Sequence, residues 1–116
     1  MGYYSIVSGE ITIKKELLEK MKQEVLEAKE KDGGPKAEWI DCNIAIGDFE
    51  DDVWMPNPEG EQYKWYGWDE YITWLMQYAE SGKIVREGEE SGDFEAYEWV
   101  DGKRYRLELV LQRIEF

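Results

Sequence analysis

The sequence contains no histidine and only one cysteine, Cys42. Without histidine the chain lacks the commonest general base, the most frequent metal ligand and the side chain that titrates closest to neutral pH. Its serines therefore have no histidine to activate them as nucleophiles. A single cysteine excludes a disulfide within the chain and a zinc site built from several cysteines. The sequence also has no glycine-rich phosphate-binding motif. We therefore expect a binding protein with no enzymatic activity, no metal ion and no cofactor.

One catalytic alternative survives these absences. A pair of carboxylates can hydrolyse a glycosidic bond without histidine or cysteine. Acidic residues are so abundant here, however, that the sequence singles out no such pair.

Long apolar segments are missing as well. No run approaches the roughly 20 apolar residues of a membrane-spanning helix. The N-terminal segment does not resemble a signal peptide. We expect a cytoplasmic protein that does not bind membranes.

Basic residues are scarce relative to acidic ones. The chain has 14 lysines and arginines against 27 aspartates and glutamates, and its formal net charge is −13. Such a surface repels nucleic acid, whose phosphates are also negative, so direct nucleic-acid binding is disfavoured. The charge instead favours a basic protein as partner, including one whose basic surface normally grips nucleic acid.

Large apolar side chains, by contrast, are plentiful. Of the 116 residues 42% are hydrophobic and 15% aromatic, with six tryptophans and eight tyrosines. A chain of this length buries roughly two-thirds of its unfolded surface, which is enough for one hydrophobic core. We therefore expect a single acidic α+β domain over residues 1–116.

Hydrophobic periodicity predicts the elements of the first half. Residues 3–13 alternate as a strand does, and Gly9 within it indicates a bulge or close packing. Residues 15–31 carry the apolar stripe of an amphipathic helix. Residues 38–46 alternate between apolar and polar side chains, which predicts another strand with Cys42 as a buried structural thiol rather than a nucleophile.

An acidic loop is predicted over residues 47–62. A second helix is expected over residues 69–80, with Asp69 as its N-cap and Gly82 beyond its end. Residues 83–88 are the next candidate strand.

The C-terminal part predicts a β-hairpin. Residues 94–100 and 103–111 flank Asp101-Gly102, which is a strong type I′ turn signal. The inward side chains of its second strand would be Tyr105, Leu107, Leu109 and Leu111. The element order is then β-α-β-α-β-β-β, which predicts an α+β fold with a single mixed or antiparallel sheet and two helices packed on one face.

The negative charge is concentrated in two blocks. The first 31 residues hold six acids and six bases, but Glu38 to Glu61 holds eight acids and no base, and Glu87 to Asp101 holds seven acids and no base. The last predicted strand is locally basic, with Lys103, Arg104, Arg106 and Arg113. Clustered carboxylates repel one another, so the blocks favour a docking surface that a basic partner or a cation would neutralise. The alternative is a solvated acidic face that maintains solubility.

The candidate acidic partner-binding residues come from the densest parts of the two blocks. They are Glu50, Asp51, Asp52, Glu87, Glu89, Glu90 and Asp93. The last four, with two glycines among them, could also wrap a hard cation such as Ca²⁺, although their spacing differs from that of an EF-hand. The alternative is a glycine-bent acidic connection between two strands.

Eight aromatic residues lie between positions 54 and 78 and cannot all face one small core. Most of them should pack, but exposed rings beside carboxylates would form an interface hot spot with a charged rim. The candidate aromatic partner-binding residues are Trp54, Trp65, Tyr66 and Trp68. A cleft that stacks a nucleobase or sugar is the competing use of these rings.

Three segments carry a family resemblance. They are the opening MGYYSIVSGEITI, the segment KWYGWDE at residues 64–70, and GEESGDF at residues 88–94 followed by Asp101-Gly102-Lys103. In order and approximate spacing they resemble a family of small uncharacterised proteins of bacteriophage and prophage genomes. The departures are a longer middle loop over residues 47–62 and a second helix that starts with WDEY instead of a histidine-containing segment.

The resemblance implies a compact phage accessory protein in the cytoplasm of a host cell, and it transfers no catalytic residue. Small acidic phage proteins often occupy the nucleic-acid-binding surface of a host defence protein. The leading hypothesis is therefore an anti-CRISPR or other anti-defence protein, acting as a DNA mimic. The alternatives are a module that binds a nucleotide or sugar in an aromatic cleft, with anion contacts from Arg104 and Arg106, and a structural or self-assembling phage protein.

Overall fold

The computed structural model describes residues 3–108 and residue 115. Within these residues the chain forms one open antiparallel sheet of seven strands together with three helices. The strands are β1 (Ser5–Ile13), β2 (Asp48–Glu50), β3 (Val53–Met55), β4 (Gln62–Tyr63), β5 (Ala79–Gly88), β6 (Phe94–Val100) and β7 (Lys103–Leu107). The helices are α1 (Leu18–Lys31), preceded by a 3-10 turn over Lys15–Leu17, α2 (Trp39–Ile46) and α3 (Trp68–Met76). The predicted α+β class with a single sheet is confirmed.

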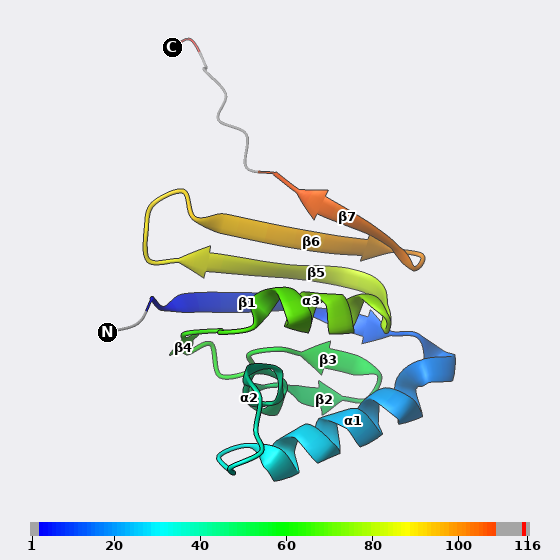
Figure 1. Cartoon of the computed structure of the whole chain (residues 1–116). Helices are drawn as coiled ribbons and strands as arrows, with labels where there is room; N and C mark the ends of the chain where they lie inside the picture. Colours follow the sequence, from blue (N-terminus) through cyan, green and yellow to red (C-terminus); the bar gives the residue numbers. More distant parts are fainter. Residues whose placement is uncertain (1–2, 109–114, 116) are drawn as a thin grey trace.

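The sheet is organised around β1. The strand order is β2-β3-β1-β5-β6-β7, and β4 also pairs with β1. One edge of β1 pairs along its whole length with β5. The other edge pairs with β4 near Ser5 and with β3 near Ile11. In Figure 1 the helices gather on one side of this sheet, with α3 lying across β1.

The alternation predicted for β1 is confirmed. Val7, Ile11 and Ile13 are buried under the helices. Gly9 has a φ of +100°, and a Cβ atom there would lie 2.1 Å from the Lys83 carbonyl oxygen on β5. Any larger side chain would therefore push β1 and β5 apart, which is the close packing that the glycine indicated.

The amphipathic helix predicted over residues 15–31 is confirmed as the 3-10 turn and α1. Its stripe of Met21, Val25 and Ala28 is buried. The helix ends at Lys31, the last residue of the predicted range.

The strand predicted over residues 38–46 is wrong, because this segment is helix α2. Its apolar residues Ile40 and Ile44 are four positions apart, and that spacing puts two side chains on one face of a helix as well as of a strand. A capping box decides for the helix: the Glu38 N–H donates to Asp41 Oδ2 at 3.0 Å, and the Glu38 side chain accepts from the N3 backbone. The reading of Cys42 changes with it, since the thiol is half-buried on α2 instead of lying inside a strand.

The loop predicted over residues 47–62 is also wrong in part. Strands β2 and β3 form a hairpin within it, and Asp51 takes the left-handed turn conformation with a φ of +54°. The Phe49 and Trp54 rings pack edge to face across the hairpin, with centroids 4.9 Å apart. Trp54 is completely buried, so the hairpin closes the core beside α1.

Helix α3 is shorter than predicted. It starts at Trp68 and ends at Met76, and its N-cap is Gly67, with a φ of +76°, instead of Asp69. Strand β5 begins already at Ala79, so Gly82 lies inside a strand and does not terminate the helix. On its inner face, Ile72 and Leu75 are buried.

The hairpin around Asp101-Gly102 is confirmed by the pairing of β6 with β7. Tyr105, which was expected to face inward, is 49% exposed, because its side of β7 is the side of the sheet opposite the helices. Leu107, also predicted to face inward, is half-buried. Leu109, Leu111 and the basic Arg113 lie outside the described residues.

Candidate functional site

The predicted acidic residues lie at two ends of the sheet. Residues 50–52 are exposed at the β2–β3 turn, where the Ile13 N–H donates to the Asp52 carbonyl at 2.9 Å. At the other end of the sheet, Glu87 pairs with Ile6 near the start of β1. From Glu87 the chain continues into the exposed β5–β6 connection. Because a strand rises about 3.3 Å per residue, the seven steps from Ile6 to Ile13 separate the two acidic sets by about 23 Å. The structure therefore does not bring them together in one patch.

Three of the four predicted aromatic residues are buried. Trp54, Trp65 and Trp68 belong to the hydrophobic core, and direct contact of a partner with their full rings would require the core to open. Tyr66 is 44% exposed and is the one member that offers its ring to solvent. It packs on Trp39, which is 63% exposed, with ring centroids 5.0 Å apart. The sequence pattern did not single out Trp39.

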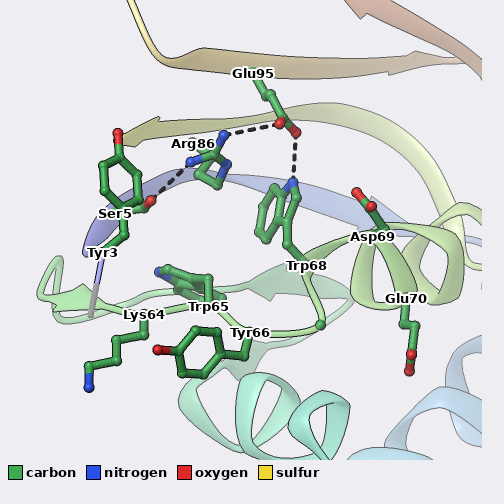
Figure 2. Close-up of a pocket in the computed structure, with 11 residues that line it drawn as sticks. Tyr3, Ser5, Lys64, Trp65, Tyr66, Trp68, Asp69, Glu70, Arg86 and Glu95 are labelled. Carbon is green, nitrogen blue, oxygen red and sulfur yellow. Dashed lines mark hydrogen bonds and ion pairs between the residues drawn. The ribbon is translucent and has the colours of Figure 1, made fainter. Parts of the chain in front are cut away.

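Residues 64–70 form one wall of a pocket of about 550 Å³, shown in Figure 2. The other wall comes from three neighbouring strands and their ends: Tyr3 and Ser5 at the start of β1, Arg86 on β5 and Glu95 on β6. Arg86 and Glu95 face each other because they are cross-strand partners in the β5–β6 register. We call this the Trp68 pocket. It brings part of the aromatic segment together with Glu95 of the second acidic block.

Arg86 organises the charges of the Trp68 pocket. Its Nη2 donates to Asp93 Oδ1 and to Glu95 Oε1, each at 3.0 Å, and its Nη1 donates to Ser5 Oγ at 2.9 Å. The Arg86 side chain is only 11% exposed. Within the described part of the chain, the salt bridges are those that Arg86 forms with Asp93 and with Glu95. The guanidinium is thus bound by two carboxylates and a hydroxyl.

Glu95 joins the ion pair to the aromatic wall. Its Oε2 accepts hydrogen bonds from Trp68 Nε1 at 2.8 Å and from the Tyr97 hydroxyl at 3.2 Å. Burial acts to raise the pKa of Glu95, but the hydrogen bonds from Arg86 and Trp68 outweigh it and hold that pKa below its usual value. Glu95 is therefore ionised at neutral pH.

Asp93 ties the β5–β6 connection to the N-terminal segment. The Tyr3 hydroxyl donates to Asp93 Oδ2 at 2.6 Å and accepts from the Glu90 N–H at 3.0 Å. Hydrogen bonds from Arg86 and from Tyr3 lower the pKa of Asp93, and the same contact with Asp93 raises the pKa of Tyr3. Asp93 was predicted to contact a partner. Its carboxylate binds Arg86 and Tyr3, and its contact with a partner stays a prediction.

The remaining charged side chains of the Trp68 pocket are Lys64, Asp69 and Glu70. The Lys64 ammonium lies 5.7 Å from the centroid of the Tyr4 ring, and Figure 2 shows it pointing away from Arg86. Asp69 and Glu70 are exposed, and their carboxylates form no hydrogen bond or salt bridge to the residues that the structure describes. Against Arg86 and Lys64 the pocket region holds Asp69, Glu70, Asp93 and Glu95. Two positive and four negative charges leave it with a net charge of −2.

Sequence reasoning missed Tyr3, Ser5, Asp69, Arg86 and Glu95 as members of a common site. Arg86 is the basic residue immediately before the second acidic block, so its position was a usable signal. Its alignment with Glu95 depends on the register of the β5–β6 hairpin, and its contact with Ser5 depends on the pairing of β1 with β5. Neither register can be read from a local pattern.

A metal site built from acidic residues and a nucleophilic role for Cys42 gain no geometric support. Across residues 3–108 and 115, no group of three or more histidine, cysteine, aspartate or glutamate side chains is arranged to hold a metal ion. Burial, followed by a hydrogen bond with Asp32, raises the pKa of the Cys42 thiol. The thiol is therefore protonated at neutral pH and is a poor nucleophile.

Comparison of the chain with protein-family models, with curated proteins and with solved structures finds no match. No helix among the described residues is long and apolar enough to cross a membrane.

Proposed function

We propose that this protein is a non-enzymatic binding protein whose acidic surface engages a basic, nucleic-acid-handling protein and blocks its nucleic-acid site. An acidic surface attracts clusters of arginine and lysine and accelerates their association, and it repels nucleic acid itself. The partner would lose access to nucleic acid because both ligands use the same basic residues.

The observation that carries this proposal is the number of exposed carboxylates that have no cationic partner among the residues that the structure describes. In the described residues, salt bridges neutralise only Asp93 and Glu95. The exposed acidic residues of the sheet ends and of the Trp68 pocket are Asp48, Glu50, Asp51, Asp52, Asp69, Glu70, Glu87, Glu89 and Glu90. Their mutual repulsion would be relieved by a basic partner.

Within this class we propose an anti-defence protein of a phage, such as an anti-CRISPR protein, that acts in the host cytoplasm. The support for this narrower statement is the resemblance of residues 1–13, 64–70 and 88–94 to small phage proteins. A host defence nuclease or its nucleic-acid-binding subunit would be the partner.

The proposal is tested by capture of partners from host lysate, with washes at stepped salt and identification by mass spectrometry. We expect a basic nucleic-acid-binding protein that elutes as the salt concentration rises, because exposed charge pairs are screened. The captured protein is then purified, and its binding to labelled nucleic acid is measured with and without this chain. Nucleic-acid binding that is unaffected by the chain would contradict the proposal.

Charge-reversal variants locate the docking surface. Replacement of Glu87, Glu89 and Glu90 by lysine should weaken capture more than replacement of Glu16 and Glu19, which are also exposed but lie in and just before the charge-balanced helix α1. Asp93 is left unchanged, since it holds Arg86 and its loss would disturb the fold. A separate variant with lysine at Glu50, Asp51 and Asp52 tests the opposite end of the sheet. Equal effects of all three changes would argue against a specific acidic surface.

A second candidate function is the binding of a small nucleotide or sugar, which the Trp68 pocket favours through its volume of about 550 Å³ and its aromatic wall. Arg104 and Arg106 do not line this pocket, and Arg104 instead contacts the Met76 sulfur at 3.4 Å. The anion contacts expected from the basic strand would have to come from Lys64 or from Arg86, whose Nη groups already donate to Ser5, Asp93 and Glu95. A thermal-shift screen with nucleotides and sugars distinguishes this function by a rise of several degrees in Tm.

A further inference from the structure

The Trp68 pocket is built to attract a cation. Arg86 contributes no free charge to it, because Asp93 and Glu95 bind the guanidinium from two sides. Lys64 directs its ammonium group to the Tyr4 ring. What remains accessible are the carboxylates of Asp69 and Glu70 in the first turn of α3. A ligand entering the pocket therefore meets negative charge.

The same pocket offers aromatic surface next to these carboxylates. Tyr66 lies at its rim with 44% of its surface exposed, and Trp68 forms its inner wall. In Figure 2 the Asp69 side chain extends from α3 beside Trp68 and toward the strand that carries Glu95. The Glu70 side chain points away from that strand. Aromatic faces and a carboxylate together recognise a cation that is flat and can donate two hydrogen bonds side by side.

We infer that the Trp68 pocket receives an arginine side chain of the basic partner. The inference rests on the proposed function and names the residue type that the partner contributes. Tyr66 at the rim offers a ring face on which a guanidinium can stack, and Asp69 offers a carboxylate that accepts its hydrogen bonds. Lysine fits less well, because its ammonium is a compact, strongly hydrated charge that neither stacks on a ring nor forms a parallel pair of hydrogen bonds.

An anionic ligand fits the pocket poorly by the same reasoning. The four donor contacts of Arg86 all end on Ser5, Asp93 or Glu95. An anion would have to displace one of these carboxylates and would then lie close to the others. It would also approach Asp69, which repels it.

The test compares two labelled peptides of equal length and charge, one of arginines and one of lysines, by fluorescence anisotropy. Arginine peptides often bind acidic proteins better than lysine peptides do, so the decisive quantity is how a substitution changes the ratio of the two dissociation constants. We expect Tyr66→Ala and Asp69→Asn each to lower the preference for arginine by roughly three- to tenfold. Binding of the lysine peptide should change far less.

Two matched variants control for surface and charge. Tyr105→Ala removes an aromatic ring of similar exposure, 49%, that does not line the pocket. Asp52→Asn removes one exposed carboxylate at the far end of the sheet. We expect both controls to leave the ratio of the two dissociation constants unchanged, although Asp52→Asn weakens both peptides slightly.

The indole N–H resonances of a ¹⁵N-labelled sample locate the binding site directly. The Trp68 indole N–H donates to Glu95 at the pocket wall, so its resonance should shift as the arginine peptide is added. The Trp54 indole N–H donates to the buried Tyr71 hydroxyl at 3.0 Å and should stay in place.

The outcomes separate this inference from the proposed function. If both peptides bind with strong salt dependence, but Tyr66→Ala and Asp69→Asn leave the ratio unchanged, the arginine pocket is wrong and the acidic docking surface stands. If neither peptide binds even at low salt, the docking surface itself is contradicted. A Trp68 resonance that does not move while the peptide binds also overturns the arginine pocket.

Discussion

At the scale of single residues, Arg86 connects more of the candidate site than any neighbouring side chain. It joins β5 to Glu95 on β6, to Ser5 on β1 and to Asp93 in the connection that follows. A buried guanidinium is stable only with such partners, and its carboxylates in turn depend on it. The wall of the Trp68 pocket should therefore lose its geometry when Arg86 is replaced.

We expect Arg86→Gln to lower the free energy of unfolding by about 2 kcal/mol. The value is below that of a fully buried ion pair because the Asp93 and Glu95 side chains are 31% and 24% exposed. Urea denaturation measures it. Arg104→Gln serves as the control, since Arg104 is exposed, and it should change stability by less than about 0.5 kcal/mol. Equal losses in the two variants would contradict a structural role for Arg86.

The effect of Arg86→Gln should depend on pH. Arg86 helps to lower the pKa values of Asp93 and Glu95 in the folded protein. A lowered pKa contributes stability above the unfolded value, which is about 4 for these groups, and that stability is lost as the pH falls through the folded pKa. Urea denaturation of wild type and variant should therefore differ most near about pH 7 and converge below about pH 4. A difference that is constant over this range would show that Arg86 does not act through its charge.

At the scale of elements, the contact between α2 and the start of α3 positions the exposed aromatic pair Trp39 and Tyr66. Gly67 takes the left-handed conformation at the N-cap of α3, with a φ of +76°. A Cβ atom there would lie 3.0 Å from Cβ of Trp39 on α2. A second contact joins the same two segments: the Asn43 amide of α2 donates to the Tyr66 carbonyl at 2.6 Å. The Tyr66 carbonyl and the following Gly67 are thus both packed against α2.

Gly67→Ala should cost about 2 kcal/mol of unfolding free energy. About half comes from placing an alanine in the left-handed region, and the rest from displacing Trp39. Gly60→Ala is the matched control: Gly60 has a φ of +70°, and a Cβ atom there has nothing within 4 Å. It should therefore cost only the backbone part, about 1 kcal/mol. Urea denaturation of the two variants tests this, and a loss in Gly60→Ala as large as in Gly67→Ala would rule out the contact with Trp39 as a cause.

At the scale of the whole molecule, repulsion among carboxylates opposes folding. The net charge is −13, and the salt bridges of the described residues neutralise only two acidic side chains. Self-repulsion of this kind destabilises a compact state, and dissolved ions screen it. The acidic ends of the sheet are the regions where a bound partner would relieve it.

We therefore expect the protein to become more stable as salt is added. Between about 0.02 M and about 0.5 M NaCl the free energy of unfolding should rise on the order of 1 kcal/mol, the size of one carboxylate–carboxylate repulsion at about 4 Å in water. Chemical denaturation with urea, which adds no ions, measures the change. A fall in stability over this range would mean that attractive ion pairs outweigh the repulsion.

The outcomes of the sequence-based predictions differ between particular segments for physical reasons. The helix over residues 15–31 and the hairpin around Asp101-Gly102 were predictable, since an apolar stripe and a type I′ turn are local signals. Segment 38–46 was mispredicted because its isoleucines suit both a helix and a strand. The β2–β3 hairpin escaped prediction because strands of three residues are too short to show an alternation.

The sequence by itself determined the acidic character of the protein, the absence of histidine chemistry and the α+β class, because composition and local periodicity need no knowledge of long-range contacts. Only the tertiary structure decided which charged and aromatic side chains meet. It buried Trp54, Trp65 and Trp68 and left Tyr66 at the surface. It also placed Arg86 between Ser5 and Glu95, and it put the two acidic sets at opposite ends of β1. These arrangements depend on strand register and helix placement, which join residues far apart in the chain.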